Sequence, residues 1–332
     1  MNIFVSGGTG FVGRNLVWAL AQAGHQVTFS GRNRKAALLV LGKSILPTKF
    51  FEMDHSDPAF QNKLQHYLRS MDAVIHNAAL SSPWGTYDQF HRANVEATHL
   101  LLQASKIAGI SKFIYLSTPT VYFKFEDLFN IAEESTLPSP VNFYAKTKLD
   151  GENLVASSGI PQTIIFRPRA IFGPWDTTLF PRLLRVMKLG KVPIFRNGQI
   201  WTDLTFIDNL TAAALLSLKH NTNEPVSIFN ISNGTPIQIT SLFEYIKTYF
   251  DLDFKTINLP HTPIHILASL FEKVSILTKN EPLFTPYSIG TLAFSQTLNI
   301  SKAKQILGYK PLVTIEEGIA RTANWWTREG GL

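Results

Sequence analysis

Two residues with the types and spacing for proton transfer are Tyr144 and Lys148, in the run Tyr-Ala-Lys-Thr-Lys. The segment is expected to be helical, so a spacing of four places both side chains on one face, one turn apart. A phenol beside an ammonium can exchange a proton near neutral pH, because the positive charge favours phenolate and lowers the tyrosine pKa. The same spacing also suits a tyrosine packed at a core edge beside a solvated lysine. The pair therefore needs support from elsewhere in the chain.

A glycine-rich turn near the N-terminus predicts a dinucleotide site. A short apolar strand at 2–5 precedes Gly7-x-x-Gly10-x-x-Gly13, and an amphipathic helix then runs to about Ala23. Gly10 would let the backbone approach a pyrophosphate, Gly13 would let the helix pack on the strand, and the helix N-terminus would face the negative charge. The expected cofactor contacts in this turn are Gly7, Gly10, Phe11, Val12 and Gly13.

The end of the second predicted strand, at 26–30, indicates which dinucleotide binds. An acidic residue there would bond the ribose 2′-hydroxyl of NAD, but this chain has no carboxylate and three cations, Arg32, Arg34 and Lys35. A 2′-phosphate matches the planar fork of an arginine. We therefore predict NADP(H) in preference to NAD(H), with Arg32 as its contact. The alternative is that Arg34 and Lys35 are solvated residues at the start of a helix.

Strands alternate with helical segments along the first two thirds of the chain, with further strands predicted at 49–52, 73–76, 112–116 and 162–166. This order predicts an α/β fold, a Rossmann-type doubly wound parallel sheet with helices on both faces. Ligands bind such sheets at the carboxyl ends of the strands. The expected cofactor contacts that follow these strands are Asp54, Asn77, Ala78, Ala79, Ser117 and Pro168, together with Tyr144 and Lys148 of the helix. Asp54 is a candidate to contact the adenine, or else an N-cap before Pro58.

The pattern changes after Arg169, which predicts a smaller, mixed C-terminal substrate domain. We expect residues 1–168 plus about 204–232 to form the dinucleotide-binding domain, and about 169–203 plus 233–332 the substrate-binding domain. The apolar segment 263–277 could be core, line an apolar pocket or touch a membrane surface.

Composition narrows the classes of function. The chain has no cysteine, which excludes disulfides and thiolate metal sites, and its nine histidines show no metal-like clustering, so no metal is expected. The N-terminus does not resemble a signal peptide and no apolar run reaches spanning length, so we expect a cytoplasmic protein, with membrane association left open. The net charge of +7 suits a phosphorylated cofactor, an acidic substrate or a membrane surface, or simply a solvated basic surface. Dispersed basic residues argue against nucleic acid.

Taken together, these motifs resemble the extended short-chain dehydrogenase/reductase superfamily, also called the NAD-dependent epimerase/dehydratase superfamily, over nearly the whole chain. The glycine motif, Asn77-Ala78-Ala79 and Tyr144-x-x-x-Lys148 match its patterns, and Thr118 falls three residues before Val121-Tyr122, where its catalytic Ser or Thr stands. The similarity is greatest to the 3β-hydroxysteroid dehydrogenase branch and to bacterial 2-alkyl-3-oxoalkanoate reductases. It is carried by the stretches 76–79, 84–88, 117–119, 167–174 and Ile207-Asp208-Asn209. Phe123 departs from the pattern, since glycine is common there.

The resemblance implies a role for each motif. Tyr144 would exchange a proton with a substrate oxygen, Lys148 would lower the tyrosine pKa and hold the nicotinamide ribose, and Thr118 would bond the same oxygen. Pro168 would lie beside the carboxamide. Thr118 could instead bond only its own backbone. Asn94 could support its helix or a water chain, or be an ordinary surface residue. The superfamily often forms homodimers.

Three functions fit these expectations. The first is an NADP(H)-dependent oxidoreductase interconverting 3-oxo and 3-hydroxy groups on an apolar substrate, sterol-like or a long-chain β-keto acid. The second is a nucleotide-sugar epimerase, dehydratase or reductase, with Arg182, Arg185 and Lys188 as candidate diphosphate contacts or as the outer face of a helix. The third is a non-catalytic NADP(H)-binding sensor or assembly protein.

Overall fold

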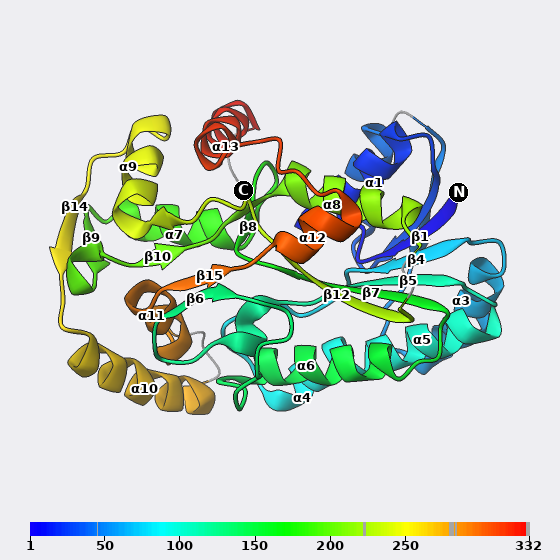
Figure 1. Ribbon diagram of the computed structural model, residues 1–332, viewed down its shortest axis with the longest axis horizontal. Coiled ribbons are helices and arrows are strands. Elements are labelled where there is room, and N and C mark those ends of the chain that lie inside the picture. The colour runs from blue at the N-terminus through cyan, green and yellow to red at the C-terminus, as the bar shows by residue number, and fades with distance from the viewer. Residues whose placement is uncertain (45, 222–223, 279–281, 283, 330–332) are drawn as a thin grey trace.

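A seven-stranded parallel sheet forms the centre of the molecule (Figure 1). The computed structural model describes residues 1–44, 46–221, 224–278, 282 and 284–329. The strand order is β12-β7-β5-β4-β1-β2-β3, and every neighbouring pair is parallel. The strands are β1 (Asn2–Ser6), β2 (Gln26–Gly31), β3 (Thr48–Glu52), β4 (Ala73–His76), β5 (Lys112–Leu116), β7 (Gln162–Pro168) and β12 (Val226–Ile231). The predicted doubly wound α/β fold is confirmed.

Helices cover both faces of this sheet. Successive side chains of each strand point to opposite faces, and apolar residues occupy both. Ile3 and Val5 of β1 belong to one core, and Phe4 between them belongs to the other. The first core packs under α1 (Phe11–Gln22), α2 (Arg34–Gly42) and α8 (Ile207–Lys219). The second packs under α3 (Gln61–Leu68), α5 (Ala97–Ile107) and α6 (Phe143–Ala156). Figure 1 shows α1 and α8 above the sheet and α5 and α6 below it.

The helical segment from Tyr87 to Ile107 has three parts. It consists of α4 (Tyr87–His91), a π-helical turn at Arg92–Glu96 and α5. Such turns are common at functional sites. Asn94 lies in this turn, and its side chain points inward rather than to solvent.

The remaining strands form three small sheets beside the main one. They are β6 (Leu128–Ile131), β8 (Ile171–Phe172), β9 (Lys191–Ile194), β10 (Trp201–Thr202), β11 (Thr205–Phe206), β13 (Ile237–Gln238), β14 (Lys255–Asn258) and β15 (Gln296–Leu298). The run from Trp201 to Phe206 forms the two strands β10 and β11, which belong to different sheets. It is interrupted at Asp203, whose carboxylate accepts the Leu298 backbone N–H at 2.7 Å.

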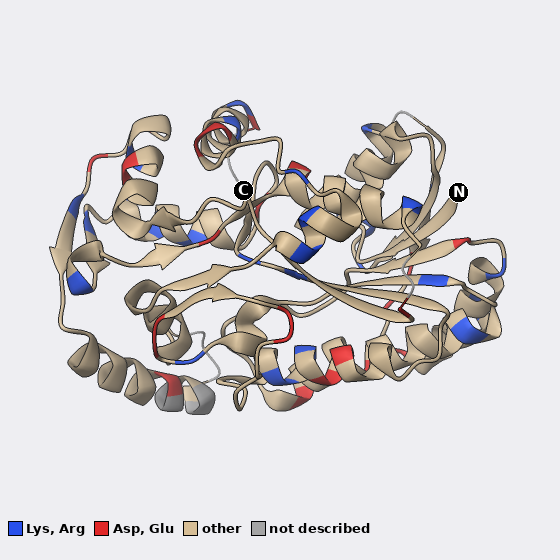
Figure 2. Ribbon diagram, viewed as in Figure 1, with Lys and Arg blue, Asp and Glu red and all other residues tan. Residues whose placement is uncertain are grey.

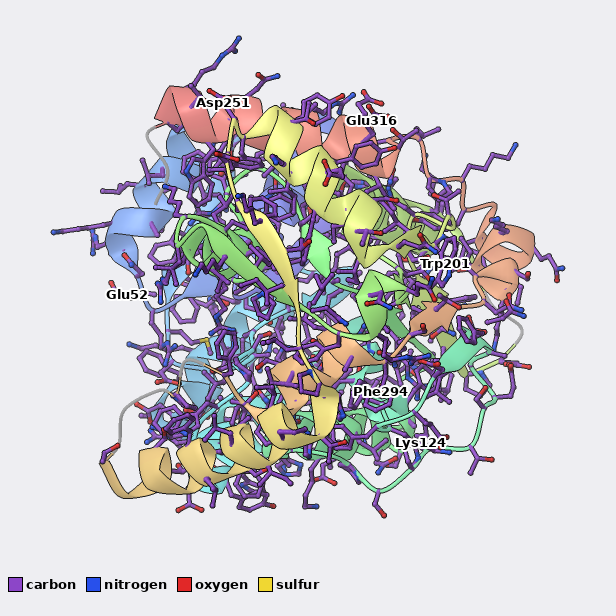
Figure 3. All side chains as sticks on the ribbon, turned by 90° about the vertical axis from the view of Figure 1, so that its left-hand side faces the viewer. Glu52, Lys124, Trp201, Asp251, Phe294 and Glu316 are labelled. Atoms are coloured by element: carbon purple, nitrogen blue, oxygen red, sulfur yellow. The ribbon has the colours of Figure 1, made fainter. Side chains whose placement is uncertain are left out.

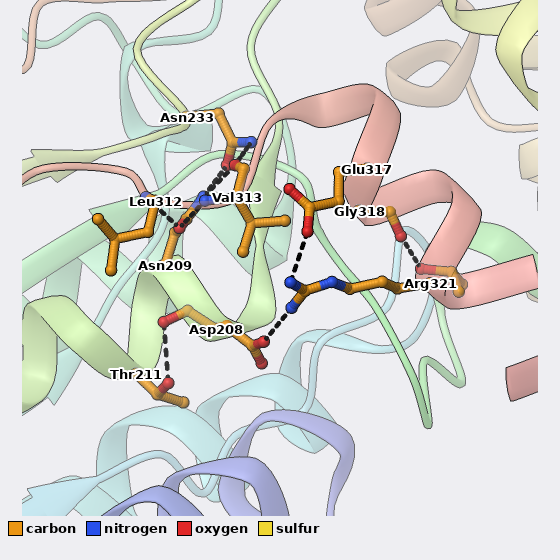
Figure 4. Close-up of polar contacts among 10 residues, drawn as sticks. Asp208, Asn209, Thr211, Asn233, Leu312, Val313, Glu317, Gly318 and Arg321 are labelled. Carbon is orange, nitrogen blue, oxygen red and sulfur yellow. Dashed lines mark hydrogen bonds and ion pairs between the residues drawn. The ribbon is translucent and has the colours of Figure 1, made fainter. Parts of the chain in front are cut away.

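Six further α-helices lie in the described part of the chain. They are α7 (Leu179–Met187), α9 (Ile239–Tyr249), α10 (His261–Thr278), α11 (Pro286–Ala293), α12 (Ser301–Leu307) and α13 (Ile315–Glu329). The last part of the chain is joined to α8 by Asn209, which bonds Asn233 and the backbone at 312–313 (Figure 4).

The apolar segment 263–277 lies within α10, and part of it is exposed. Ile266, Leu267, Leu270 and Phe271 are each 45% or more exposed, whereas Ala268 is buried. This face is therefore not core. Figure 3 shows α10 along the lower edge of the molecule below Phe294, whose ring lies 4.9 Å from that of His261. No helix within the described residues is long and apolar enough to cross a membrane.

Charged residues are distributed over the whole molecule. Figure 2 shows Lys and Arg interspersed with Asp and Glu, without a single basic patch in the view. Arg182, Arg185 and Lys188 are exposed on and just after α7. Within the part of the chain that the structure describes, no group of three or more His, Asp or Glu residues could hold a metal ion.

Candidate active site

Helix α6 carries the proton-transfer pair against the end of β5. Asn142 caps the helix by accepting the Ala145 backbone N–H at 2.8 Å. Gly151 allows close approach, because a Cβ at this position would clash with the Tyr115 hydroxyl of β5. The helix therefore lies directly against the strand after which Thr118 follows.

Lys148 is 2% exposed, and its Nζ donates a 2.6 Å hydrogen bond to the Leu116 carbonyl. The ammonium also lies 3.9 Å from the centre of the Tyr115 ring, a cation–π contact. Burial lowers the pKa of Lys148 to about 7, and the Glu152 charge acts in the opposite direction. The side chain is thus fixed at the sheet edge and can lose its proton near neutral pH.

Tyr144 is partly buried and lies near two other hydroxyls. Burial raises its pKa, and hydrogen bonds with Ser81 and Thr118 act to lower it. The predicted lowering of the tyrosine pKa by Lys148 is wrong for this structure. Burial dominates, and the Lys148 ammonium is bonded to the Leu116 carbonyl.

Thr118 follows β5 and is 6% exposed. It caps the short 3₁₀ turn Pro119–Tyr122, accepting the Thr120 backbone N–H at 3.2 Å, so the proposed local bond does form. The same oxygen also bonds Tyr144 and lies 2.9 Å from the Thr120 hydroxyl. Thr120 in turn lies 2.9 Å from the hydroxyl of Tyr287 on α11.

Asn94 is 1% exposed and links three segments. Its Oδ1 accepts the Leu80 backbone N–H at 2.7 Å, and its Nδ2 donates to the Leu80 carbonyl and to the Thr147 hydroxyl. The π-helical turn thus holds both the loop after β4 and helix α6. The interpretation of Asn94 as an ordinary surface residue is wrong, because the side chain supports the site from within.

An ion pair lies beneath Lys148. Arg167 donates to both oxygens of Glu152, at 2.9 and 2.5 Å, and both side chains are at most 4% exposed. Ser117 donates to Glu152 at 2.5 Å. The Ser117 hydroxyl is therefore bonded inside the protein. Its backbone N–H also donates to the Phe166 carbonyl, at 2.7 Å, so both hydrogen-bond donors of this residue are used within the protein.

The glycine turn has the shape that a dinucleotide needs. Gly7 has φ +68°, and a Cβ there would lie 2.8 Å from the Ala78 backbone, while one at Gly13 would overlap the Gly7 carbonyl. Gly10 is exposed and has only the Gly7 oxygen, at 3.4 Å, near its Cβ position. The turn is thus tightly packed inward and open outward.

The first turn of α1 is suited to an anion. Its N-cap, Gly10, supplies no side-chain hydrogen bond, and the first turn holds no acidic residue. The free N–H groups and the helix dipole favour negative charge here. Phe11 is buried and Val12 partly buried at this helix start, so both support the turn. The residues present fit a pyrophosphate.

The ribose side of the predicted site is open and basic. The Arg32 side chain is 79% exposed, and its Nη1 lies 4.0 Å from the Asp54 carboxylate. Asp54 accepts the backbone N–H and the hydroxyl of Ser56, at 2.9 and 2.7 Å. The residue that caps the turn at Pro58 is Asp57, so Asp54 is not that cap.

The segment after β4 is held by a buried histidine. The Ser6 hydroxyl accepts the backbone N–H groups of Asn77 and Ala78, both at 3.1 Å, and bonds His76 Nδ1 at 2.7 Å. His76 Nε2 bonds Thr98, whose own proton goes to the Asn94 carbonyl. This network assigns the proton to Nε2. Burial holds the His76 pKa well below its usual value.

The predicted residues therefore meet at one edge of the sheet. Asn77 to Ala79, Thr118 and Pro168 follow or end β4, β5 and β7, and the parallel register aligns Ser6 with His76, His76 with Tyr115, and Leu116 with Phe166. The sequence reasoning missed Ser81, Thr120 and Tyr287. Ser81 and Thr120 lie near predicted motifs, but no local signal marks Tyr287.

The family model described as the NAD dependent epimerase/dehydratase family matches residues 3–232. The chain belongs to this family. A NAD(P) dinucleotide is the cofactor expected for it, and the glycine turn and the α1 N-terminus fit one.

Curated relatives cover nearly the whole chain. An uncharacterised protein of Escherichia coli strain K12 is 31% identical, over 100% of this chain and 99% of its own. A 2-alkyl-3-oxoalkanoate reductase of Stenotrophomonas maltophilia is 29% identical, over 97% and 98%. The decarboxylating sterol-4-alpha-carboxylate 3-dehydrogenase of Mus musculus is 28% identical, over 96% and 89%.

Solved structures share the fold. A UDP-glucuronic acid 4-epimerase from Bacillus cereus in complex with NAD aligns over 99% of this chain and 97% of its own, with TM-score 0.77 and 23% identity. A UDP-glucose 4-epimerase from Stenotrophomonas maltophila aligns over 99% of each chain, with TM-score 0.80 and 20% identity. At these identities the likeness concerns architecture.

Proposed function

We propose that this chain is an NADP(H)-dependent oxidoreductase that interconverts a 3-oxo and a 3-hydroxy group on an apolar substrate. The observation that carries the proposal is the Tyr144 phenol, which lies near the Thr118 and Ser81 hydroxyls, one helical turn from the buried Lys148. A proton donor with neighbouring hydroxyls at the carboxyl edge of a Rossmann-type sheet is the arrangement that carbonyl reduction requires.

Some of these residues would bind the cofactor, and others would transfer the proton or stabilise the reacting oxygen. When bound, the dinucleotide supplies a hydride to the carbonyl carbon or takes one from the alcohol. Tyr144 donates a proton to the carbonyl oxygen during reduction and accepts it during oxidation. Thr118 donates a hydrogen bond to the same oxygen and stabilises the charge that develops there. Lys148, one turn from Tyr144, would hold the nicotinamide ribose, and Pro168 the carboxamide.

The relatives support an apolar substrate with a carboxylate near the reacting carbon. The names of two of them denote activity on 2-alkyl-3-oxoalkanoates and on sterol carboxylates. Aromatic residues also approach the site in this chain. Tyr287 reaches Thr120, and its ring lies 5.1 Å from that of Phe123. We propose a sterol-like or long-chain β-keto acid substrate.

The cofactor preference rests on the end of β2. Arg32 is exposed there, and the structure places no carboxylate within β2 or at the two residues that follow it. An exposed guanidinium suits a 2′-phosphate. Titration of the protein with NADPH and with NADH, followed by fluorescence, should give tighter binding of NADPH. Equal or tighter binding of NADH would contradict the preference.

The reaction is tested in the oxidation direction, since 3-oxo acids lose CO₂ spontaneously. Purified protein with NADP⁺ and a long-chain 2-alkyl-3-hydroxyalkanoate should form NADPH. Tyr144→Phe should lower kcat by at least about 10²-fold, because the proton acceptor is lost. Tyr249→Phe, on the surface of α9, should leave the rate unchanged.

Two outcomes would contradict the proposal. Retained turnover in Tyr144→Phe would exclude the tyrosine mechanism. Conversion of UDP-glucose with NAD, in the absence of NADPH formation from the hydroxy acid, would favour the nucleotide-sugar reaction instead.

A further inference from the structure

A chain of hydroxyl groups connects Tyr144 to the C-terminal part of the molecule. The Tyr144 hydroxyl lies near that of Thr118, which acts to lower the Tyr144 pKa. The Thr118 and Thr120 hydroxyl oxygens are 2.9 Å apart, and the Thr120 and Tyr287 oxygens are also 2.9 Å apart. The Arg169 guanidinium lies near the Tyr287 hydroxyl at the far end. We call these four hydroxyl groups the hydroxyl chain.

Arg169 favours one direction of the hydroxyl chain. A guanidinium has five donors and no acceptor, so a hydroxyl near it is oriented with its oxygen toward the guanidinium and its proton toward another acceptor. Tyr287 then donates to Thr120, and Thr120 donates to Thr118. Arg169 is 6% exposed and follows β7 directly, so it is held by the main sheet.

The valences at Thr118 agree with this direction. Its oxygen accepts the Thr120 backbone N–H at 3.2 Å and, in the direction that Arg169 sets, the Thr120 hydroxyl proton. Both acceptor positions of the Thr118 oxygen are then occupied, so its own proton is the one hydrogen-bonding group that is left. That proton can only be donated onward, to Tyr144 or to a substrate oxygen that takes its place.

The position of Tyr287 is fixed by features of this chain. It lies in the first turn of α11, which begins at Pro286 and is closed by a reciprocal capping box between Thr285 and Ser288. Its ring packs edge-on against Phe123, the residue that departs from the glycine common in the resembling proteins. Gly290 makes room for that ring, since a Cβ there would lie 2.9 Å from Phe123 Cζ.

We propose that Tyr287 and Arg169 are positioning residues that orient the Thr118 hydroxyl as a donor to the reacting oxygen. The inference rests on the proposed function and assigns a C-terminal helix to the catalytic hydrogen bonding. Hydrogen bonds arranged donor to acceptor in one direction polarise each other, so the last donor is strengthened. Loss of Tyr287 leaves Thr120 and Thr118 free to reverse, and Thr118 then stops donating part of the time.

The central test is Tyr287→Phe, which keeps the ring against Phe123 and removes only the hydroxyl. In alcohol oxidation we expect kcat to be about tenfold lower, with KM and NADPH affinity little changed. The reason is that the weakened hydrogen bond is the one from Thr118 to the reacting oxygen. The limb of the pH profile that reports Tyr144 deprotonation should move to higher pH, since a weaker Thr118 donor stabilises phenolate less. Tyr309→Phe removes a buried hydroxyl bonded to the Ser232 carbonyl, and should leave that limb in place.

A double-mutant cycle separates orientation from general packing. Tyr287→Phe should have little further effect in a Thr118→Ala background, because the group it orients is gone. Thr120→Val should reproduce the Tyr287→Phe defect. Gly290→Ala, which pushes α11 from Phe123, should lower kcat while the tyrosine is still present.

The Tyr144→Phe and Tyr287→Phe variants test the proposed function and the role of Tyr287 separately. If the wild type turns over and Tyr144→Phe does not, the proposed function stands. An unchanged kcat and pH profile in Tyr287→Phe, or the same fold-loss in both Thr118 backgrounds, would then overturn the role of Tyr287 alone.

Discussion

At the scale of single residues, burial determines the chemistry of the site. Tyr144 and Lys148 are four residues apart, as proton transfer requires, but their pKa values shift in opposite directions for one reason. Burial disfavours the charged form of each, so the phenol pKa rises and the ammonium pKa falls to about 7. The cofactor-free protein thus holds a neutral tyrosine one helical turn from a lysine that is close to losing its proton.

The Lys148 shift predicts a pH dependence of stability. Below about pH 7 the lysine is protonated in both states; above it the folded protein releases the proton, while the unfolded chain keeps it up to about 10.5. The unfolded state then binds more protons, so the free energy of unfolding should rise with pH across this window. Denaturant titration of Lys148→Met should show a smaller rise than the wild type.

Lys146 provides the matched control on the same helix, since its side chain is 48% exposed and pairs with Asp150. Lys146→Met should keep the wild-type pH dependence. An identical slope in Lys148→Met and the wild type would show that burial of Lys148 does not control it.

At the scale of elements, the start of α1 combines local rigidity with an open anion site. The glycines are packed against Ala78 and against one another, while the N-cap Gly10 faces outward with an extended backbone, φ −76° and ψ 174°. Any residue can adopt that conformation. The helix therefore lacks a side-chain cap at the point where the dinucleotide is expected.

Gly10→Asp should separate folding from cofactor binding. The carboxylate would cap α1 and raise stability of the cofactor-free protein by a few tenths of a kcal/mol. It would also repel the diphosphate, so the rise in melting temperature that NADPH causes in the wild type should be lost.

Gly10→Asn distinguishes charge from bulk, because asparagine has nearly the same size and no charge. We expect it to retain part of the NADPH-induced rise. A wild-type rise in Gly10→Asp would contradict the placement of the diphosphate at this helix end.

At the scale of the whole molecule, a few buried polar side chains join segments far apart in sequence. Asn209 at the start of α8 is 1% exposed. It donates to Asn233 at 2.9 Å and to the Val313 carbonyl at 2.8 Å, and accepts the backbone N–H groups of Leu312 and Val313 (Figure 4). The main sheet and the C-terminal segment are thereby connected.

Asn209→Ala should lower the free energy of unfolding by about 2 kcal/mol or more, because several buried groups lose their partners. The neighbouring Asp208→Ala removes a pair with Arg321 in which both side chains are about half exposed, and should change it by less than about 1 kcal/mol. Denaturant titration of both variants makes the comparison. Equal losses would contradict the central role assigned to Asn209.

The fold class follows from the amino-acid sequence, and so do the positions along it of most candidate site residues. Glycines at 7, 10 and 13 are dictated by backbone geometry and close packing, and alternation of strands and helices dictates a parallel sheet whose carboxyl ends meet. The spacing of Tyr144 and Lys148 follows from the helical period. These rules concern residues close together in the sequence, so they can be applied without knowledge of the tertiary contacts.

The surroundings of those residues are set by tertiary packing. Thr120 and Tyr287 are 167 positions apart, and nothing local places one beside the other. The pi-helical turn that buries Asn94 depends on Leu80 and Thr147, and the lowered pKa of Lys148 depends on what covers it. Desolvation and long-range hydrogen bonding are properties of packing, so they become definite only when the chain has folded.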